Sequence, residues 1–433
     1  MATRTRRTPE RLKVPENPLD SDEKQARFRE AQRVHAIPTL RIRERAPTPV
    51  QGVAEPLVMH HQMRNGLLPF IARGAGLAHK LDEIHAVYDA IMQDDLRYDL
   101  REGTPLPSGA SGALSPFLMN MSLGARQDSA LRYQCEPVVP RRALGGRSRA
   151  FKERLRQATG LGWGSYAVEK VIAAWVAAVP YNAMTLDNIR PSFGVRHYPD
   201  RPPDICAYFV LEHDDPRWSH DATRRALLAM GEAELWEQVD AFCRATFREL
   251  GLFILAVDLP ADGSYEVKLY KRSEKIGRAQ LQRLLDVVHA GPEGEERFRE
   301  FRRTFVPSYV RNLIGGIGFV MDRGGRPPVA KIYLDTSMMY DDWEAVQRLS
   351  RWLTALGYAQ PRDFWESLRT RLAPQQSLEG VGNFMDMVSL DVGAAGLFKT
   401  SLYYAPEVSL GRLAREWPRE LPTWDGALAW DRT

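Results

Sequence analysis

Five segments of the chain have the pattern of β-hairpins. In each, two runs rich in β-branched and aromatic residues flank a short segment rich in Gly, Pro or Asp, which is typical of two antiparallel strands and their turn. Between the hairpins the apolar spacing becomes helical. The hairpins span residues 116–139, 191–210, 252–271, 316–334 and 384–404, and the helical segments span 147–179, 221–250, 278–312 and 341–372. The chain therefore repeats a helical pair and a hairpin, with a period of roughly 60 to 70 residues.

This repeat constrains the fold. Five hairpins supply about ten antiparallel strands, and a sheet of that width left open tends to curl or split, whereas closure removes its edges. We therefore predict an α/β fold, with a closed antiparallel barrel of about ten strands surrounded by helices and an interior wider than side chains can fill. The alternative is two separate α+β domains divided near residue 250.

The N-terminal region differs from the rest in composition. Residues 1–50 are rich in Arg, Pro and Glu, so we predict a flexible N-terminal arm there. Residues 51–433 are expected to form a single barrel domain with helical extensions at both ends.

The charge of the chain is nearly balanced. Its 59 Lys and Arg residues face 55 Asp and Glu residues, and the basic residues are spread along the sequence. The net positive charge is much smaller than that of a typical nucleic-acid-binding protein, and it is better suited to a local anionic ligand. We therefore expect no nucleic-acid partner.

The spacing of the cysteines and the length of the apolar runs bear on where in the cell the protein is found. Cys135, Cys206 and Cys243 are too widely separated for a disulfide framework or a Cys-x-x-Cys metal site. No run reaches the roughly 18 apolar residues of a membrane span, and the basic N-terminus lacks the apolar core of a signal peptide. We therefore expect a soluble cytoplasmic protein with no membrane partner.

The closing strands of the hairpins share a polar pattern. Alternate residues of a strand lie on one face, so Lys268 and Tyr270 point the same way, as do Lys331 and Tyr333. The apolar residues between them suit an outer helical layer, which places Lys and Tyr in the lumen. Cations crowded there would cost several kcal/mol unless an anion compensates them. A polyanionic ligand is therefore predicted; the alternative is amphipathic strands whose Lys and Tyr face water.

The order of these strands resembles the aromatic prenyltransferases of the ABBA or PT-barrel type, most closely the dimethylallyltryptophan synthase group, over residues 105–405. In that family, Lys-x-Tyr strands bind the diphosphate and a ring of Tyr shields the allylic cation. The segment from Arg132 to Pro137 resembles the family's Arg-x-x-x-Glu-Pro strand. The resemblance implies diphosphate binding by Arg132, Lys268 and Lys331, with Lys399, Arg196 and Arg272 as further candidates, and a cation shield of Tyr208, Tyr270, Tyr333 and Tyr403.

Four positions depart from the family pattern. Cys206 stands where the family usually has Lys, and Glu266 stands where an Arg would precede Lys268. Ser401 replaces a larger residue, and Leu118 follows Pro116-Phe117 where the family's first strand typically carries a Glu that holds an indole N–H. These departures move the expected acceptor away from free tryptophan.

The resemblance implies an enzyme of secondary metabolism. It would move a dimethylallyl or geranyl group from its diphosphate to an electron-rich aromatic acceptor, by ionisation and Friedel-Crafts-type attack. Glu136 shares a face with Arg132 and is a candidate base, as is Glu266; the alternative is a structural Glu that pairs with Arg or Lys. No cofactor is expected, Mg²⁺ is not expected to be essential, and the Asp-rich run at 94–99 is read as a helix end without a metal.

Two other functions remain open at this point. One is the same chemistry on Tyr or Trp of a peptide substrate. The other is a non-catalytic barrel that binds a small anion or aromatic molecule, which the departures at Cys206 and Leu118 favour and the intact Lys-x-Tyr pairs oppose.

Overall fold

A computed structural model describes most of the chain between residues 62 and 404. The predicted arm, residues 1–50, lies outside the described residues, and so does most of the helical segment expected at 341–372. The described residues are 62–93, 117–123, 130–136, 144–161, 166–178, 189–211, 216–246, 252, 254–276, 278–306, 313–321, 328–335, 348–349, 351–353, 355–356, 385–394 and 398–404.

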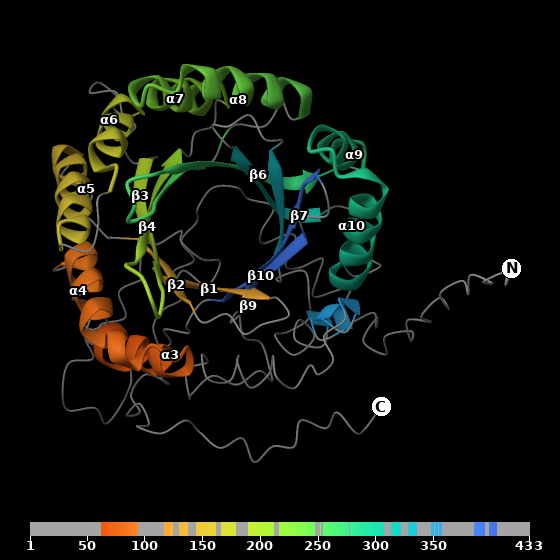
Figure 1. Cartoon of the computed structure of the whole chain (residues 1–433). Helices are drawn as coiled ribbons and strands as arrows, with labels where there is room; N and C mark the ends of the chain where they lie inside the picture. The colour runs from red at the N-terminus through yellow and green to blue at the C-terminus, as the bar shows by residue number, and fades with distance from the viewer. Residues whose placement is uncertain are drawn as a thin grey trace, which may run out of the picture. The chain divides into compact units, whose positions relative to one another are not determined.

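The described strands form one closed barrel (Figure 1). Ten antiparallel strands follow one another in sequence order, and β1 pairs with β10 to close the ring. The predicted barrel is confirmed, and the alternative of two domains divided near residue 250 is wrong. The strands are β1 (Phe117–Leu123), β2 (Leu131–Cys135), β3 (Ile189–His197), β4 (Asp204–Leu211), β5 (Ile254–Leu259), β6 (Glu266–Ile276), β7 (Leu313–Met321), β8 (Val329–Asp335), β9 (Met385–Val392) and β10 (Phe398–Tyr404).

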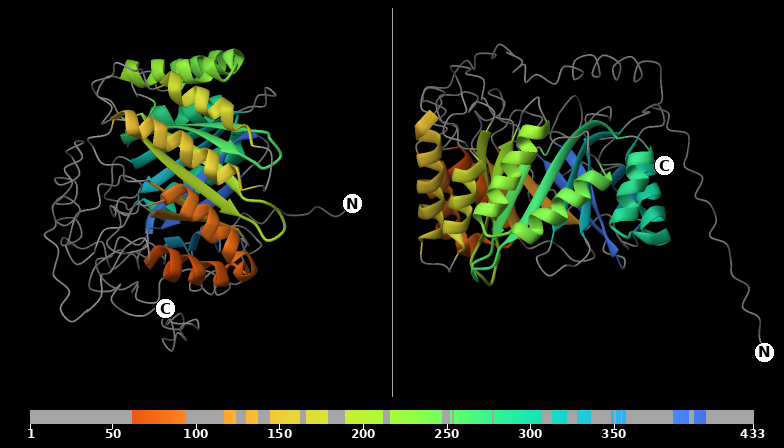
Figure 2. Two further views of the ribbon diagram at one scale, coloured as in Figure 1. Left: turned by 90° about the vertical axis from the view of Figure 1, so that its left-hand side faces the viewer. Right: turned by 90° about the horizontal axis from the view of Figure 1, so that it is seen from above.

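Helices surround the barrel on its outside (Figures 1 and 2). Pairs of helices connect the first four hairpins, as the repeat in the sequence predicts; most of the connection between β8 and β9 lies outside the described residues. Among the described residues, no helix combines the length and the apolar character needed to cross a bilayer. The helices are η1 (Gln62–Leu67), α3 (Leu68–Gly74), η2 (Ala78–Lys80), α4 (Leu81–Met92), α5 (Leu144–Thr159), α6 (Val168–Ala178), α7 (Pro216–Ala229), α8 (Ala233–Thr246), α9 (Arg278–Val287) and α10 (Gly291–Phe305).

The core lies between the barrel wall and the helices. Phe151 of α5 stacks on Phe193 of β3 with ring centroids 5.4 Å apart, and Trp175 of α6 packs edge-on against Phe209 of β4 at 5.2 Å. All four side chains are buried. Burying one such ring contributes about 1.5–3 kcal/mol, and a one-residue slip of a strand would turn it into the lumen. The aromatic core therefore sets which residues of β3 and β4 face inward.

A second aromatic cluster does the same for β10. Trp352 packs edge-on against Phe301 and Phe305 of α10, and its indole Nε1 donates a hydrogen bond of 2.9 Å to Oγ1 of Thr400. Thr400 and Leu402 are thereby buried on the outer face of β10. The alternate residues of this strand consequently face the lumen.

Candidate active site

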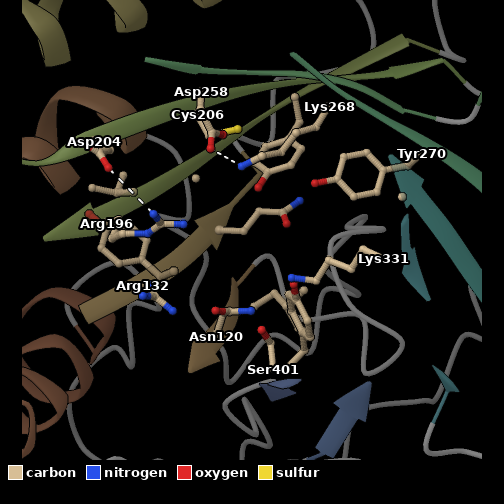
Figure 3. A pocket seen from close by; sticks show the side chains of 18 of the residues that line it. Asn120, Arg132, Arg196, Asp204, Cys206, Asp258, Lys268, Tyr270, Lys331 and Ser401 are labelled. Atoms are coloured by element: carbon tan, nitrogen blue, oxygen red, sulfur yellow. Dashed lines mark hydrogen bonds and ion pairs between the residues drawn. The ribbon is translucent and has the colours of Figure 1, made fainter. Parts of the chain in front are cut away.

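The barrel encloses a cavity of about 390 Å³, and every strand contributes at least one lining residue. Charged side chains point into it (Figure 3). The cations that line it are Arg132, Arg196, Lys268, Lys331 and Lys399, and the acids are Asp204, Asp258, Glu266 and Asp391.

Lys268 on β6 is held by two carboxylates. Its Nζ forms an ion pair with Asp258 on the neighbouring strand β5, and Glu266 Oε2 lies 3.4 Å away (Figure 3). The Lys268 and Asp258 side chains are each only 18% exposed. Burial opposes the charge of Lys268, but Asp258 together with Tyr270, Cys206 and Glu266 outweighs it and raises the pKa of the amine. Lys268 is therefore a charged and fixed donor.

Lys331 on β8 repeats this arrangement. Its Nζ lies 3.4 Å from Oδ1 of Asp391 on β9. The same nitrogen lies 5.7 Å from the ring centroid of Tyr333 and 5.5 Å from that of Tyr403. Burial opposes the charge, but Tyr403 and Asp391 raise the pKa of Lys331 above its usual value. The π faces that surround this ammonium can stabilise a cation.

Two arginines meet on β2 and β3. Arg132 and Arg196 lie directly opposite each other across the two strands. Arg132 donates a hydrogen bond to Ser122 Oγ. The Arg196 guanidinium lies 3.9 Å from Asp204 and donates a 3.0 Å hydrogen bond to the hydroxyl of Tyr198. Like charges directly opposite each other are destabilising, so an anion bound here would relieve this repulsion.

Lys399 on β10 lies beside other cations. Burial, followed by the positive charges of Arg132 and Lys331, lowers its pKa to about 8. The Asp391 carboxylate on the neighbouring strand opposes this shift without cancelling it. Lys399 therefore loses its proton much more readily than an ordinary lysine.

A row of four tyrosines crosses the cavity wall. The ring centroids of Tyr208 and Tyr270 lie 6.4 Å apart, those of Tyr270 and Tyr333 lie 6.0 Å apart, and those of Tyr333 and Tyr403 lie 5.5 Å apart. Burial raises the pKa values of Tyr208, Tyr270 and Tyr333, so these three remain neutral phenols.

Glycine makes room for these rings. A Cβ atom on Gly318 of β7 would lie 3.0 Å from the Tyr270 ring and 3.2 Å from the Tyr333 ring. A Cβ atom on Gly194 of β3 would lie 2.9 Å from the Tyr208 ring. Contacts this short force a neighbour to move, so the tyrosine row depends on both glycines.

The structure brings together nearly all of the residues predicted for the site. Among the predicted side chains that the structure describes, the exception is Glu136, which lies just beyond the end of β2, is buried, and does not line the cavity. Strand alternation with Arg132 no longer applies there, because the strand ends at Cys135. The side chain of Arg272 lies outside the described part of the chain. The predicted residues that line the cavity are Arg132, Arg196, Glu266, Lys268, Lys331, Lys399, Tyr208, Tyr270, Tyr333 and Tyr403.

Apart from Glu266, sequence reasoning missed the acidic residues of the site. Asp258 and Asp391 lie on the opening strands of their hairpins, whereas the prediction rested on the closing strands. Asp391 lies directly opposite both Lys331 and Lys399, and a register assignment within the last hairpin would have indicated it. Cys206 lies beside Asp258, and burial raises the pKa of its thiol, so Cys206 adds no charge. Among the described residues, no three His, Cys, Asp or Glu side chains are grouped to hold a metal ion.

The fold is that of the ABBA, or PT-barrel, prenyltransferases. The chain is similar to 5-dimethylallyltryptophan synthase from Streptomyces coelicolor, with a TM-score of 0.64 and 18% identity over 80% of this chain and 97% of that one. It is also similar to 6-dimethylallyltryptophan synthase from Micromonospora olivasterospora in complex with DMASPP and Trp, with a TM-score of 0.62 and 20% identity over 84% of this chain and 99% of the other. A third similar structure is AnaPT from Neosartorya fischeri, with a TM-score of 0.61 and 16% identity over 83% of this chain and 96% of that one. No protein-family model and no curated protein sequence matches the chain.

The Lys268–Asp258 pair makes a prediction for stability. Lys268→Met leaves the Asp258 carboxylate without its cation, so the free energy of unfolding should fall by about 2 kcal/mol. The double variant Lys268→Met/Asp258→Asn should recover most of this loss, because neither charge remains. Urea denaturation measures both, with Lys152→Met on α5 as a control that stays within about 0.5 kcal/mol of the wild type. A double variant as unstable as Lys268→Met would show that the pair does not hold the site.

Proposed function

We propose that the chain is an aromatic prenyltransferase that moves a dimethylallyl group from its diphosphate to an electron-rich aromatic acceptor. The observation that carries this proposal is the row of four tyrosines beside lumen cations inside a closed barrel. In such a site, the cations can hold an anionic leaving group and the tyrosine rings can stabilise a carbocation next to it. Similar structures support it, since those of the two dimethylallyltryptophan synthases contain DMASPP and Trp.

The cations would drive the ionisation step. When the C–O bond of the allylic diphosphate breaks, the electron pair leaves with the diphosphate, and an allylic cation remains. Preorganised positive groups lower this barrier, and they act more strongly in an enclosed site than in water. We assign the diphosphate to Arg132, Lys268 and Lys331, with Lys399 and Arg196 beside them.

The tyrosine row would protect the cation. Its π faces stabilise positive charge, and a wall of rings excludes water that would convert the cation to an alcohol. The aromatic acceptor then forms a C–C bond to the allyl group and loses its ring proton. Of the two predicted bases, only Glu266 lines the cavity. We therefore propose that the Glu266 carboxylate accepts the ring proton.

The size of the cavity bears on the donor. At about 390 Å³ it lies near the lower end of the roughly 300–1,000 Å³ typical of ligand pockets. Because donor and acceptor must share this space, we favour the five-carbon dimethylallyl donor over the ten-carbon geranyl donor. A small aromatic acceptor fits the same limit better than an aromatic side chain of a peptide.

A turnover assay tests the proposal. With dimethylallyl diphosphate and a panel of indoles, phenols and Tyr or Trp peptides, the wild type should form a prenylated product. Lys268→Ala and Lys331→Ala should each lower the rate at least about tenfold, because each removes one preorganised charge. Lys152→Ala on α5, outside the barrel, is the matched control and should keep the wild-type rate.

The assay also separates the alternatives. No product from any acceptor, together with no release of diphosphate, would contradict the enzyme and favour a binding barrel. We propose that no metal is needed, so activity should survive EDTA; loss of activity in EDTA that Mg²⁺ restores would contradict this part alone.

Lys399 makes donor binding depend on pH. Its pKa of about 8 in the free protein would rise when a polyanion binds, because the anion stabilises the charged amine. The affinity for dimethylallyl thiolodiphosphate should therefore weaken above about pH 8 and approach a tenfold loss near pH 9. The terminal phosphate of the analogue is already ionised in this range, by analogy with phosphate monoesters, whose second pKa is about 6.

Calorimetric titration across this pH range measures the effect. Lys399→Met should remove the step near pH 8 while leaving weaker binding that is nearly independent of pH. An unchanged pH dependence in Lys399→Met would show that another group titrates near pH 8 and would contradict this role of Lys399.

A further inference from the structure

Gln134 on β2 lines the cavity with its amide held in one orientation. The amide Nε2 donates a 3.0 Å hydrogen bond to Oγ of Ser192, and the Ser192 hydroxyl donates a 3.1 Å hydrogen bond to the carbonyl oxygen of Cys135. A hydroxyl has a single proton. Because Ser192 gives it to Cys135, its oxygen is left to accept from an N–H group. The nitrogen of the Gln134 amide must therefore face Ser192.

In this orientation, the amide oxygen of Gln134 faces the cavity. Ser192 is 1% exposed, so solvent does not compete for the hydrogen bonds that fix the amide. Among the described residues, Gln134 Oε1 accepts no hydrogen bond. Of the two neighbouring guanidinium groups, Arg132 donates to Ser122 and Arg196 to Tyr198. A polar acceptor in an enclosed site gains from any donor that a ligand brings.

A leucine and a tyrosine ring lie on the two sides of Gln134. Leu118 on β1 and Gly194 on β3 lie directly opposite Gln134 on its two neighbouring strands. Leu118 is buried, and Gly194 has no side chain of its own. The ring of Tyr208 occupies the space over Gly194, with Cε2 only 2.9 Å from where a Cβ would be. The slot beside the amide is therefore bounded by a leucine side chain and a phenol ring.

We propose that Gln134 selects the aromatic acceptor, with Oε1 accepting a hydrogen bond from a ring N–H or O–H while the arene lies between Leu118 and Tyr208. The inference rests on the proposed function in that it places an aromatic acceptor in the lumen. A neutral amide accepts this hydrogen bond without removing the proton, so the acceptor stays neutral. Gln134 thus favours an indole over its oxygen isostere, and a phenol over a phenol ether.

Equilibrium binding to the full chain tests the inference. Indole and benzofuran have nearly the same shape, but only indole has an N–H. With the protein saturated by dimethylallyl thiolodiphosphate, calorimetry should show the wild type binding indole about tenfold more tightly than benzofuran. Gln134→Met keeps the length of the side chain without its acceptor and should bind both arenes equally. Ser192→Ala frees the amide to rotate and should give an intermediate preference.

Gln157→Met on α5 is the matched control, because it makes the same change on the outside of the protein. It should keep the tenfold preference. Equal binding of the two arenes by the wild type, no binding of either, or a preference that persists in Gln134→Met would overturn the inference. If circular dichroism shows that Gln134→Met is unfolded, Gln134→Leu provides the same comparison.

A separate transfer assay distinguishes this inference from the proposed function. A protein that prefers indole in binding but prenylates nothing would contradict the proposed function and leave the role of Gln134 standing. A protein that prenylates arenes without any preference for a ring N–H would contradict the role of Gln134 alone.

Discussion

The ion pair between Lys268 and Asp258 meets a requirement on which the whole site depends. A closed barrel cannot hold several cations in its lumen unless nearby negative charges compensate them. Aromatic residues of α5 and α6 pack on the outer faces of β3 and β4, so the alternate polar residues must face inward. Charges placed there lose hydration. Carboxylates on the neighbouring strands offset this cost for Lys268 and Lys331.

This compensation is incomplete around β2, β3 and β10. Arg132 and Arg196 lie opposite each other, and Lys399 is so strongly affected by nearby positive charge and burial that its pKa falls to about 8. The site therefore has a well-neutralised side on β6 and β8 and a more positive side on β2, β3 and β10. In the proposed function, the diphosphate would bind the cations of the positive side directly and would replace the carboxylates beside Lys268 and Lys331 on the other side. Transfer chemistry would benefit, because donors that are already held in place need little reorganisation in the transition state.

Much of this arrangement was predictable from the sequence. The hairpins and their spacing indicated the barrel, and strand alternation placed Lys268, Tyr270, Lys331 and Tyr333 in the lumen. The prediction that Glu136 shares the lumen face with Arg132 was wrong, because β2 ends one residue before Glu136. The roles of Asp258, Asp391 and Gln134 depend on which residue lies across from which, and on side-chain hydrogen bonds. Periodicity within one strand does not contain that information.

The most direct test of the account is a crystal structure of the protein with dimethylallyl thiolodiphosphate bound. Phosphate oxygens should lie within hydrogen-bonding distance of Lys268 and Lys331, the ion pairs to Asp258 and Asp391 should lengthen, and the allyl group should lie against the tyrosine row. An analogue bound outside the lumen, or one bound inside while both lysines stay on their carboxylates without touching phosphate, would contradict it.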